Sequence, residues 1–221
     1  MAGTTATPAK RRPEPVAWSR PAAGTREVAE GFVLADTASR FAAYAIDNLI
    51  LFVVDAAILI YVAPVAVSVP GPDVASPPQI VGRIATLAVE ALYFIGSWTG
   101  GRRATVGQRL VRIEVGKAWD GQPLTASQAS RRWLAFGSWI NVASLFRPAA
   151  VFASGALAIW TLALLWTTSN SPTKQGFHDR FANTAVVRKE GGTRSVWLVL
   201  FAILAWVIVT LAWTGSLTFR G

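Results

Sequence analysis

Four long apolar runs divide the chain, and more polar segments connect them. The runs cover residues 41–63, 80–98, 149–168 and 196–214. A helix of about 20 apolar residues, rising about 1.5 Å per residue, crosses the hydrocarbon core of a bilayer. The pattern therefore predicts membrane-spanning helices and an all-α membrane protein whose helices form a transmembrane bundle.

The charges of the connecting segments predict the side of the membrane on which each one lies. Residues 64–79 contain five prolines and no lysine or arginine, which places them outside. Residues 99–132 contain seven basic residues, and residues 169–195 contain five. Because cytoplasmic loops are enriched in lysine and arginine, we expect both of these segments on the cytoplasmic side.

A single crossing cannot join two cytoplasmic segments, so the region between them needs a hairpin. Residues 133–146 form a short apolar stretch, which Arg147-Pro148 interrupts before the run at 149–168. About 14 residues span only about 21 Å, so this arm is either a thin crossing or a re-entrant half-helix. The hairpin gives about five membrane helices, with the N-terminus inside and the C-terminus outside. The alternative places 131–146 in the membrane interface and leaves four spans.

Two of the cytoplasmic segments contain short strand patterns. Residues 109–115 alternate polar and apolar side chains, and residues 184–188 are rich in β-branched side chains. Both patterns favour strands, so we predict a small two-stranded sheet beneath the bundle, with a turn over 116–121. A short helix is expected over 124–133, with Thr125 as its N-cap.

The N-terminal segment is basic and has no apolar core. It contains three consecutive basic residues at 10–12 and several prolines. A signal peptide would need an apolar stretch, and this composition is typical of disorder. We therefore expect residues 1–31 to be a disordered cytoplasmic tail.

The amino-acid composition limits the kinds of binding site and partner that we expect for this chain. The chain is 52% hydrophobic, with no cysteine and one histidine, which excludes disulfides and argues against a zinc site. We expect no metal and no cofactor. The net charge of +9 lies in segments that flank the apolar runs. It therefore predicts contact with anionic lipid headgroups rather than with nucleic acid.

Ionisable residues follow one face of the first apolar run. At 100° per residue, Arg40, Asp47 and Asp55 lie within an arc of about 100°, together with Asp36 and Tyr44. Two aspartates near the centre cost roughly 5 to 7 kcal/mol to insert, while twelve Leu, Ile, Phe and Val residues contribute roughly 4 to 7 kcal/mol. The helix therefore needs a partner that receives its polar face.

The second apolar run could be this partner, because Arg83 and Glu90 are seven residues apart and share a face. If the two helices are antiparallel neighbours, the helix rise places Asp55 beside Arg83 and Asp47 beside Glu90. The first pair would be an ion pair, and the second would need a proton or a cation between its carboxylates. We expect all these charged side chains to face the interior. The alternative is that Glu90 points elsewhere or neutralises Arg40.

The charged residues resemble the signature of the RDD family of bacterial membrane proteins, which is named for one arginine and two aspartates. Arg40 and Asp47 enclose the six residues FAAYAI, and Asp179 lies in the stretch GFHDRFANT at 176–184. These positions are similar to the arginine and the two aspartates of the family.

A third stretch adds to the resemblance. Residues 105–115, TVGQRLVRIEV, are similar to the family pattern T-x-G-K-R-x-x-G-x-x-V. The chain departs from the family at three positions: Gln108 replaces the usual lysine, Arg112 the second glycine, and Asn183 the glycine that follows the last aspartate.

The resemblance covers residues 32–188, and residues 189–221 then form an additional C-terminal transmembrane helix. It implies a multi-pass protein of the bacterial inner (plasma) membrane with a cytoplasmic N-terminus. Transport is proposed for the family, and some members resemble ion or proton antiporters.

Two functions remain open. One is a small cation- or proton-coupled transporter, expected to form a homo-oligomer because five helices enclose little pathway. The other is a non-catalytic membrane scaffold or accessory subunit whose buried charges only hold helices together. No nucleophile, base and orienting group occur together, so we do not expect an enzyme. The candidate charge network consists of Arg40, Asp47, Asp55, Arg83, Glu90, His178 and Asp179.

Overall fold

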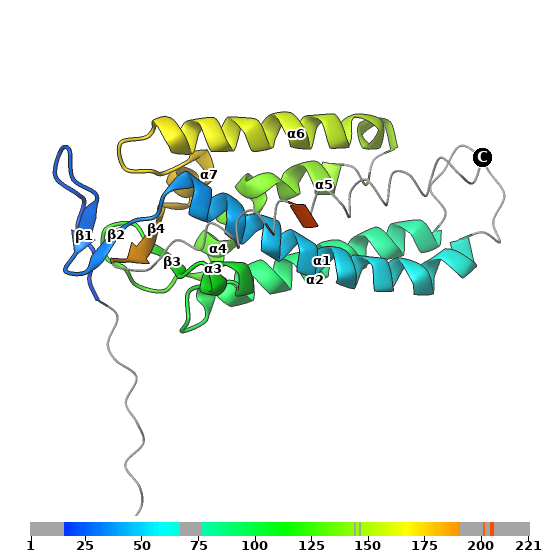
Figure 1. Ribbon diagram of the computed structural model, residues 1–221. Helices are drawn as coiled ribbons and strands as arrows, with labels where there is room; N and C mark the ends of the chain where they lie inside the picture. The colour runs from blue at the N-terminus through cyan, green and yellow to red at the C-terminus, as the bar shows by residue number, and fades with distance from the viewer. Residues whose placement is uncertain are drawn as a thin grey trace, which may run out of the picture.

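The computed structural model describes residues 16–66, 77–143, 145, 147–190, 201, 204 and 205. This part of the chain is mostly helical, with a small sheet at one end of the helices (Figure 1). The longest helices run side by side, and they are α1 (Thr37–Ala66), α2 (Pro77–Thr99) and α6 (Arg147–Asn170).

Among the described residues, two helical segments are long and apolar enough to cross a membrane, Thr37–Ile58 of α1 and Ile80–Thr99 of α2. Only 28% of the first segment and 11% of the second is buried inside the protein. Apolar side chains such as Val53 and Leu92 are therefore exposed, as expected for helices that face lipid. The predicted span 196–214 lies almost entirely outside the described residues, so the count of five membrane helices stays a prediction.

The segment predicted as the short arm of a hairpin is a broken helix. Helix α4 (Ala126–Trp133) continues through a π-helical turn, η1 (Leu134–Ser138), into α5 (Trp139–Ala143), and the chain then turns back into α6. Gly137 adopts a φ of +134°, a conformation that glycine tolerates and other residues rarely adopt. The break therefore occurs at the position that permits it.

The N-cap of α4 is the one that the sequence predicts. The hydroxyl of Thr125 accepts a hydrogen bond from the backbone N–H of Gln128 at 3.2 Å, and the Gln128 side chain binds back to the backbone of Thr125. This reciprocal capping box fixes where the helix begins.

Strand pairing places the two basic segments on the same side of the helices. Strand β3 (Ile113–Lys117) pairs antiparallel with β4 (Thr184–Lys189), with Val115 opposite Val186. The predicted two-stranded pairing is confirmed, and so is the predicted common location of the two segments. That this side is the cytoplasm stays a prediction.

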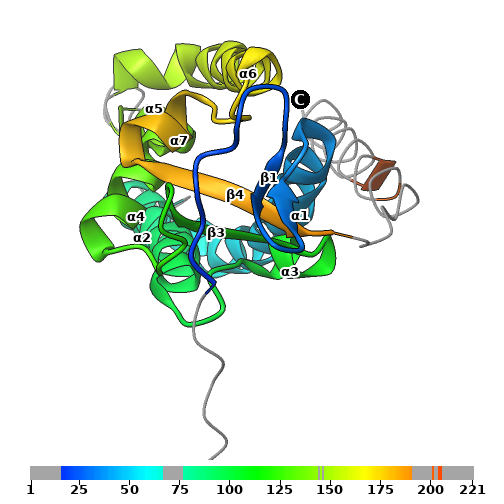
Figure 2. The same ribbon diagram turned by 90° about the vertical axis from the view of Figure 1, so that its left-hand side faces the viewer.

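The sheet of the described residues has four strands rather than two, in the order β1-β2-β4-β3. Strands β3 and β4 run side by side in it (Figure 2). The additional strands, β1 (Glu27–Ala29) and β2 (Phe32–Leu34), precede α1. The expectation of a disordered tail over residues 1–31 is therefore wrong from residue 16 onward, and residues 1–15 lie outside the described part. Trp18 is buried against Gly116 and Gly121 and lies under the Arg103 guanidinium, so long-range packing orders this segment.

The strand predicted over 109–115 begins later than expected. A short helix, α3 (Val106–Leu110), comes first, because Thr105 and Gln108 form a second capping box. Only residues from Ile113 onward join the sheet. The capping box therefore makes residues 106–110 helical, although their alternating polar and apolar pattern favours a strand.

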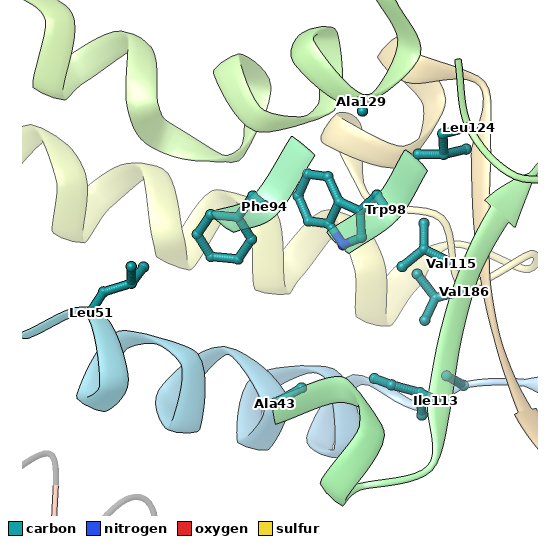
Figure 3. Close-up of a cluster of buried hydrophobic side chains, with 10 residues drawn as sticks. Ala43, Leu51, Phe94, Trp98, Ile113, Val115, Leu124, Ala129 and Val186 are labelled. Carbon is teal, nitrogen blue, oxygen red and sulfur yellow. The ribbon is translucent and has the colours of Figure 1, made fainter. Parts of the chain in front are cut away.

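An apolar core joins the helices to the sheet. Phe94 and Trp98 of α2 lie between Leu51 of α1 and the sheet residues Val115 and Val186 (Figure 3). Because this core contacts both layers, it fixes the depth of α2 relative to α1 and to the segments that follow.

Candidate functional site

Asp179 is the centre of a buried charge cluster. It lies on α7 (Phe177–Ala182) and is completely buried. Arg40 of α1 approaches it with 2.7 Å between Nη1 and Oδ2, and Nη1 of Arg132 on α4 donates to Oδ1. The backbone N–H of Gly176 also donates to Oδ2 at 3.0 Å. One carboxylate therefore ties together three helices that are distant in sequence.

The two guanidiniums determine the ionisation of Asp179. Burial alone would raise the pKa of this carboxyl group, but the positive charges of Arg132 and Arg40 outweigh burial and hold its pKa well below the ordinary range. Thr184 completes the cluster, because its hydroxyl accepts from Arg132 Nη1 and lies 3.4 Å from Asp179 Oδ1. Asp179 is therefore an ionised structural centre.

His178 lies next to this cluster but is neutral. Its ring is buried, with its edge against Phe136 at 5.0 Å between centroids, and Nε2 lies 3.5 Å from Asp179 Oδ2. Burial lowers the pKa of His178 to about 3, because no solvent stabilises the imidazolium. Within the described part of the chain, Nδ1 has no hydrogen-bond partner.

Asp47 forms the second buried site, and neutral donors hold it. The Tyr93 hydroxyl donates to Oδ1 at 2.5 Å, the Thr105 hydroxyl to Oδ2 at 2.6 Å, and the Gly107 backbone N–H to Oδ1 at 2.7 Å. Asp47 is only 2% exposed. The carboxylate therefore fastens onto α1 the connection between α2 and β3, residues 100–112, which contains α3 and is hereafter called the loop.

Glycine is required at position 107 by lack of space. A Cβ atom there would lie 2.9 Å from the Asp47 carboxylate and still closer to the Ala43 carbonyl oxygen. This close approach explains why a glycine stands at this place in the motif.

The predicted pairing of Asp47 with Glu90 is wrong. Glu90 instead accepts from Trp133 Nε1 at 3.1 Å and from the Ser138 hydroxyl at 2.8 Å. Tyr93, about one helical turn further along α2, is at the level of Asp47. The prediction from helix rise alone placed α2 about one turn away from its observed level relative to α1. Packing between the helices, which helix rise does not include, decides their relative depth.

Asp55 lies at the level where Asp47 was expected. Its carboxylate hydrogen-bonds with the hydroxyl of Thr86 on α2, and the negative charge of Glu90 acts on it. The expectation that all charges face the interior is wrong for Arg83, whose side chain is exposed. An ion pair between Asp55 and Arg83 stays a prediction.

A short chain of contacts connects the two buried sites. The Arg132 guanidinium lies 5.1 Å from the centroid of the Trp98 ring, and Trp98 Nε1 donates to Gln108 Oε1 at 3.1 Å. The same Gln108 oxygen accepts from the Thr105 backbone N–H at 2.9 Å, and Thr105 binds Asp47. Gln108, which replaces the usual lysine of the resemblance, therefore acts as a helix cap and as a bridge.

A partly open cavity of about 70 Å³ lies between the two sites. Arg40, Asp47, Arg132 and His178 contribute polar groups to its wall, and the remainder is mainly apolar. A volume of this size has room for a few water molecules. Three members of the predicted charge network, Arg40, Asp47 and His178, therefore line one space.

Several residues of the site were not recognised from sequence. The sequence indicated Arg132 only as one of the basic residues of a cytoplasmic segment. It indicated no role at this site for Tyr93, Trp98, Thr105 or Thr184. The capping box of Thr105 and Gln108 carries a local signal that could have been found. The partners of Arg132 and Tyr93 depend on tertiary packing and carry none.

The fold and the site together define a helical membrane protein with a small sheet and two buried acidic centres. The family model described as the RDD family matches residues 34–183, and the chain belongs to this family of membrane-associated proteins. The match includes Arg40, Asp47 and Asp179. Comparison with curated proteins and with solved structures found no match.

Proposed function

We propose that this protein is a small cation- or proton-coupled transporter of the bacterial plasma membrane. The observation that carries the proposal is the environment of Asp47. This carboxylate lies on a helix long enough to span a membrane, lines a cavity, and is held by three neutral donors. Ionisable residues at membrane depth are costly and commonly mark ion or proton pathways.

Protonation or cation binding at Asp47 would change the hold on the loop. An ionised carboxylate accepts from Tyr93, Thr105 and Gly107 at the same time. A protonated carboxyl group becomes a donor at one oxygen and loses acceptor capacity there. Binding of the coupling ion would therefore weaken the attachment of residues 105–107 and open the cavity toward the side that carries the sheet.

In this mechanism the Asp179 cluster stays fixed. Its carboxylate is neutralised by Arg40 and Arg132, so it presents no charge for a coupling ion to replace. It keeps α1, α4 and α7 together while the loop moves. We place the N-terminus and the sheet in the cytoplasm, beside anionic lipid headgroups, and expect a homo-oligomer.

A specific observation favours the alternative function. The ion pairs of Asp179 join three helices, as expected for a membrane scaffold or accessory subunit that only needs a rigid bundle. In that case Asp47 would serve solely to fasten the loop. Neither function includes an enzymatic reaction.

Ion flux in proteoliposomes separates the two functions. Purified protein is reconstituted, and flux of H⁺, Na⁺ and K⁺ is measured for the wild type, Asp47→Asn and the matched control Asp120→Asn, which changes an exposed loop residue. We expect at least a tenfold loss of coupled flux for Asp47→Asn and none for Asp120→Asn, with both variants folded. Flux that persists in Asp47→Asn, or a wild type that moves none of these ions, would refute the transporter.

A further inference from the structure

Arg132 has a buried hydrogen-bond donor that the protein leaves unused. The residue is 2% exposed and lines the cavity. Its Nη1 donates to Asp179 and Thr184, whereas its Nε–H has no partner in the described part of the chain. Buried polar groups are nearly always hydrogen-bonded, so this donor indicates a missing acceptor.

The charge balance at this end of the cavity indicates the sign of that acceptor. Arg40 and Arg132 contribute two positive charges, and Asp179 contributes one negative charge. His178 is neutral here, and Asp47 has its own donors at the other end. Asp36, whose charge also acts on Arg40, is paired with Arg188. Two guanidiniums therefore share the carboxylate of Asp179 at this end of the cavity, and an anionic group beside Arg132 would balance the local excess of positive charge.

The remaining walls indicate what the anion is attached to. Phe41, Phe94, Phe136, Leu164 and Leu165 line the same cavity. A small hydrated anion gains nothing from such surfaces, whereas an amphiphile covers them. Arg40 lies in the first turn of α1 and Thr168, also at the wall, in the last turn of α6. Both positions are near helix ends, and the ends of membrane-spanning helices lie close to the headgroup region.

We propose that this partly open cavity binds the phosphate of an anionic membrane amphiphile beside the Arg132 Nε–H, while the apolar part of the ligand leaves through the open side of the cavity. Basic pockets between membrane helices on the cytoplasmic side are known to take anionic headgroups. The site does not depend on transport, because a scaffold with the same cavity would bind the same ligand.

Native mass spectrometry of the full-length protein in detergent tests this site. Short-chain phosphatidylglycerol, short-chain phosphatidylcholine and inorganic phosphate are added separately at equal concentration. Thr161 lines the cavity, and its hydroxyl donates to the Leu157 backbone carbonyl in its own helix. Thr161→Trp therefore places a bulky ring in the cavity. Ile159→Trp makes the same change at a position on α6 that is 71% exposed. Leu165→Trp is a second cavity-filling variant in case the first does not fold.

The expected result is one bound phosphatidylglycerol per chain and at least tenfold weaker binding of phosphatidylcholine. Thr161→Trp or Leu165→Trp should weaken phosphatidylglycerol binding at least tenfold, whereas Ile159→Trp should leave it unchanged. Three results would overturn the proposal. They are no bound phosphatidylglycerol, equal binding by the filled and unfilled variants, and binding of inorganic phosphate without the lipid.

Discussion

Arg40 and Asp179 are separated by 139 positions in the chain, yet Nη1 of the first lies 2.7 Å from Oδ2 of the second. Both lie in the region that matches the RDD family, one near its start and one near its end. Their ion pair links the two ends of the matched region, because it joins α1 to α7, the helix that precedes β4.

Asp179→Asn should destabilise the protein strongly. The change leaves Arg40 and Arg132 buried without a counter-charge, and removal of one partner from a buried ion pair typically costs about 3–5 kcal/mol. Thermal unfolding in detergent measures this loss. Asp120→Asn, on the exposed loop, serves as the control and should leave the unfolding temperature unchanged. A variant as stable as the wild type would show that the cluster does not hold the helices together.

Gly107→Ala should detach the loop from α1. The added Cβ atom would lie 2.9 Å from the Asp47 carboxylate, so the loop must move away and the hydrogen bond from its backbone N–H is lost. Gly96→Ala is the matched control, because a Cβ atom there meets nothing within 4 Å. Limited proteolysis within residues 100–112 should become faster in the first variant and stay unchanged in the second.

His178 should make the protein sensitive to moderate acid. Burial lowers its pKa from 6.5 to about 3, so between these values the unfolded chain binds more protons than the folded one. The free energy of unfolding therefore falls as the pH falls, by up to about 1.4 kcal/mol per pH unit. His178→Phe removes the only histidine of the chain. Chemical denaturation between pH 6.5 and 4 should show a smaller slope for this variant, and equal slopes would contradict the assignment.

The two ends of the sheet should label from the same compartment. The chain has no cysteine, so single cysteines at the exposed positions Asp120 and Glu190 give clean reporters. A membrane-impermeant thiol reagent should miss both in intact cells and modify both in inverted vesicles. A cysteine at Ser76, in the connection predicted to lie outside, should behave in the opposite way. Labelling of either sheet position in intact cells would reverse the proposed orientation.

The sequence by itself determined the features that depend on neighbouring residues. Apolar runs gave the positions of α1, α2 and α6, and the basic segments predicted that residues around β3 and β4 share one side. The N-cap at Thr125 and the strand at 184–188 also follow from local patterns. These features are readable because a helix, a cap or a strand depends on residues within a few positions of one another.

Tertiary structure decided which charges meet. Asp47 binds Tyr93 and Thr105 rather than Glu90, because the core around Phe94 and Trp98 sets the depth of α2 to a level that helix length cannot specify. Asp179 has Arg132 as a second partner only because α4 and α7 pack together. The segment from Trp18 onward is ordered by a slot at Gly116 and Gly121. In each case the partners are far apart in sequence, and no local pattern encodes their contact.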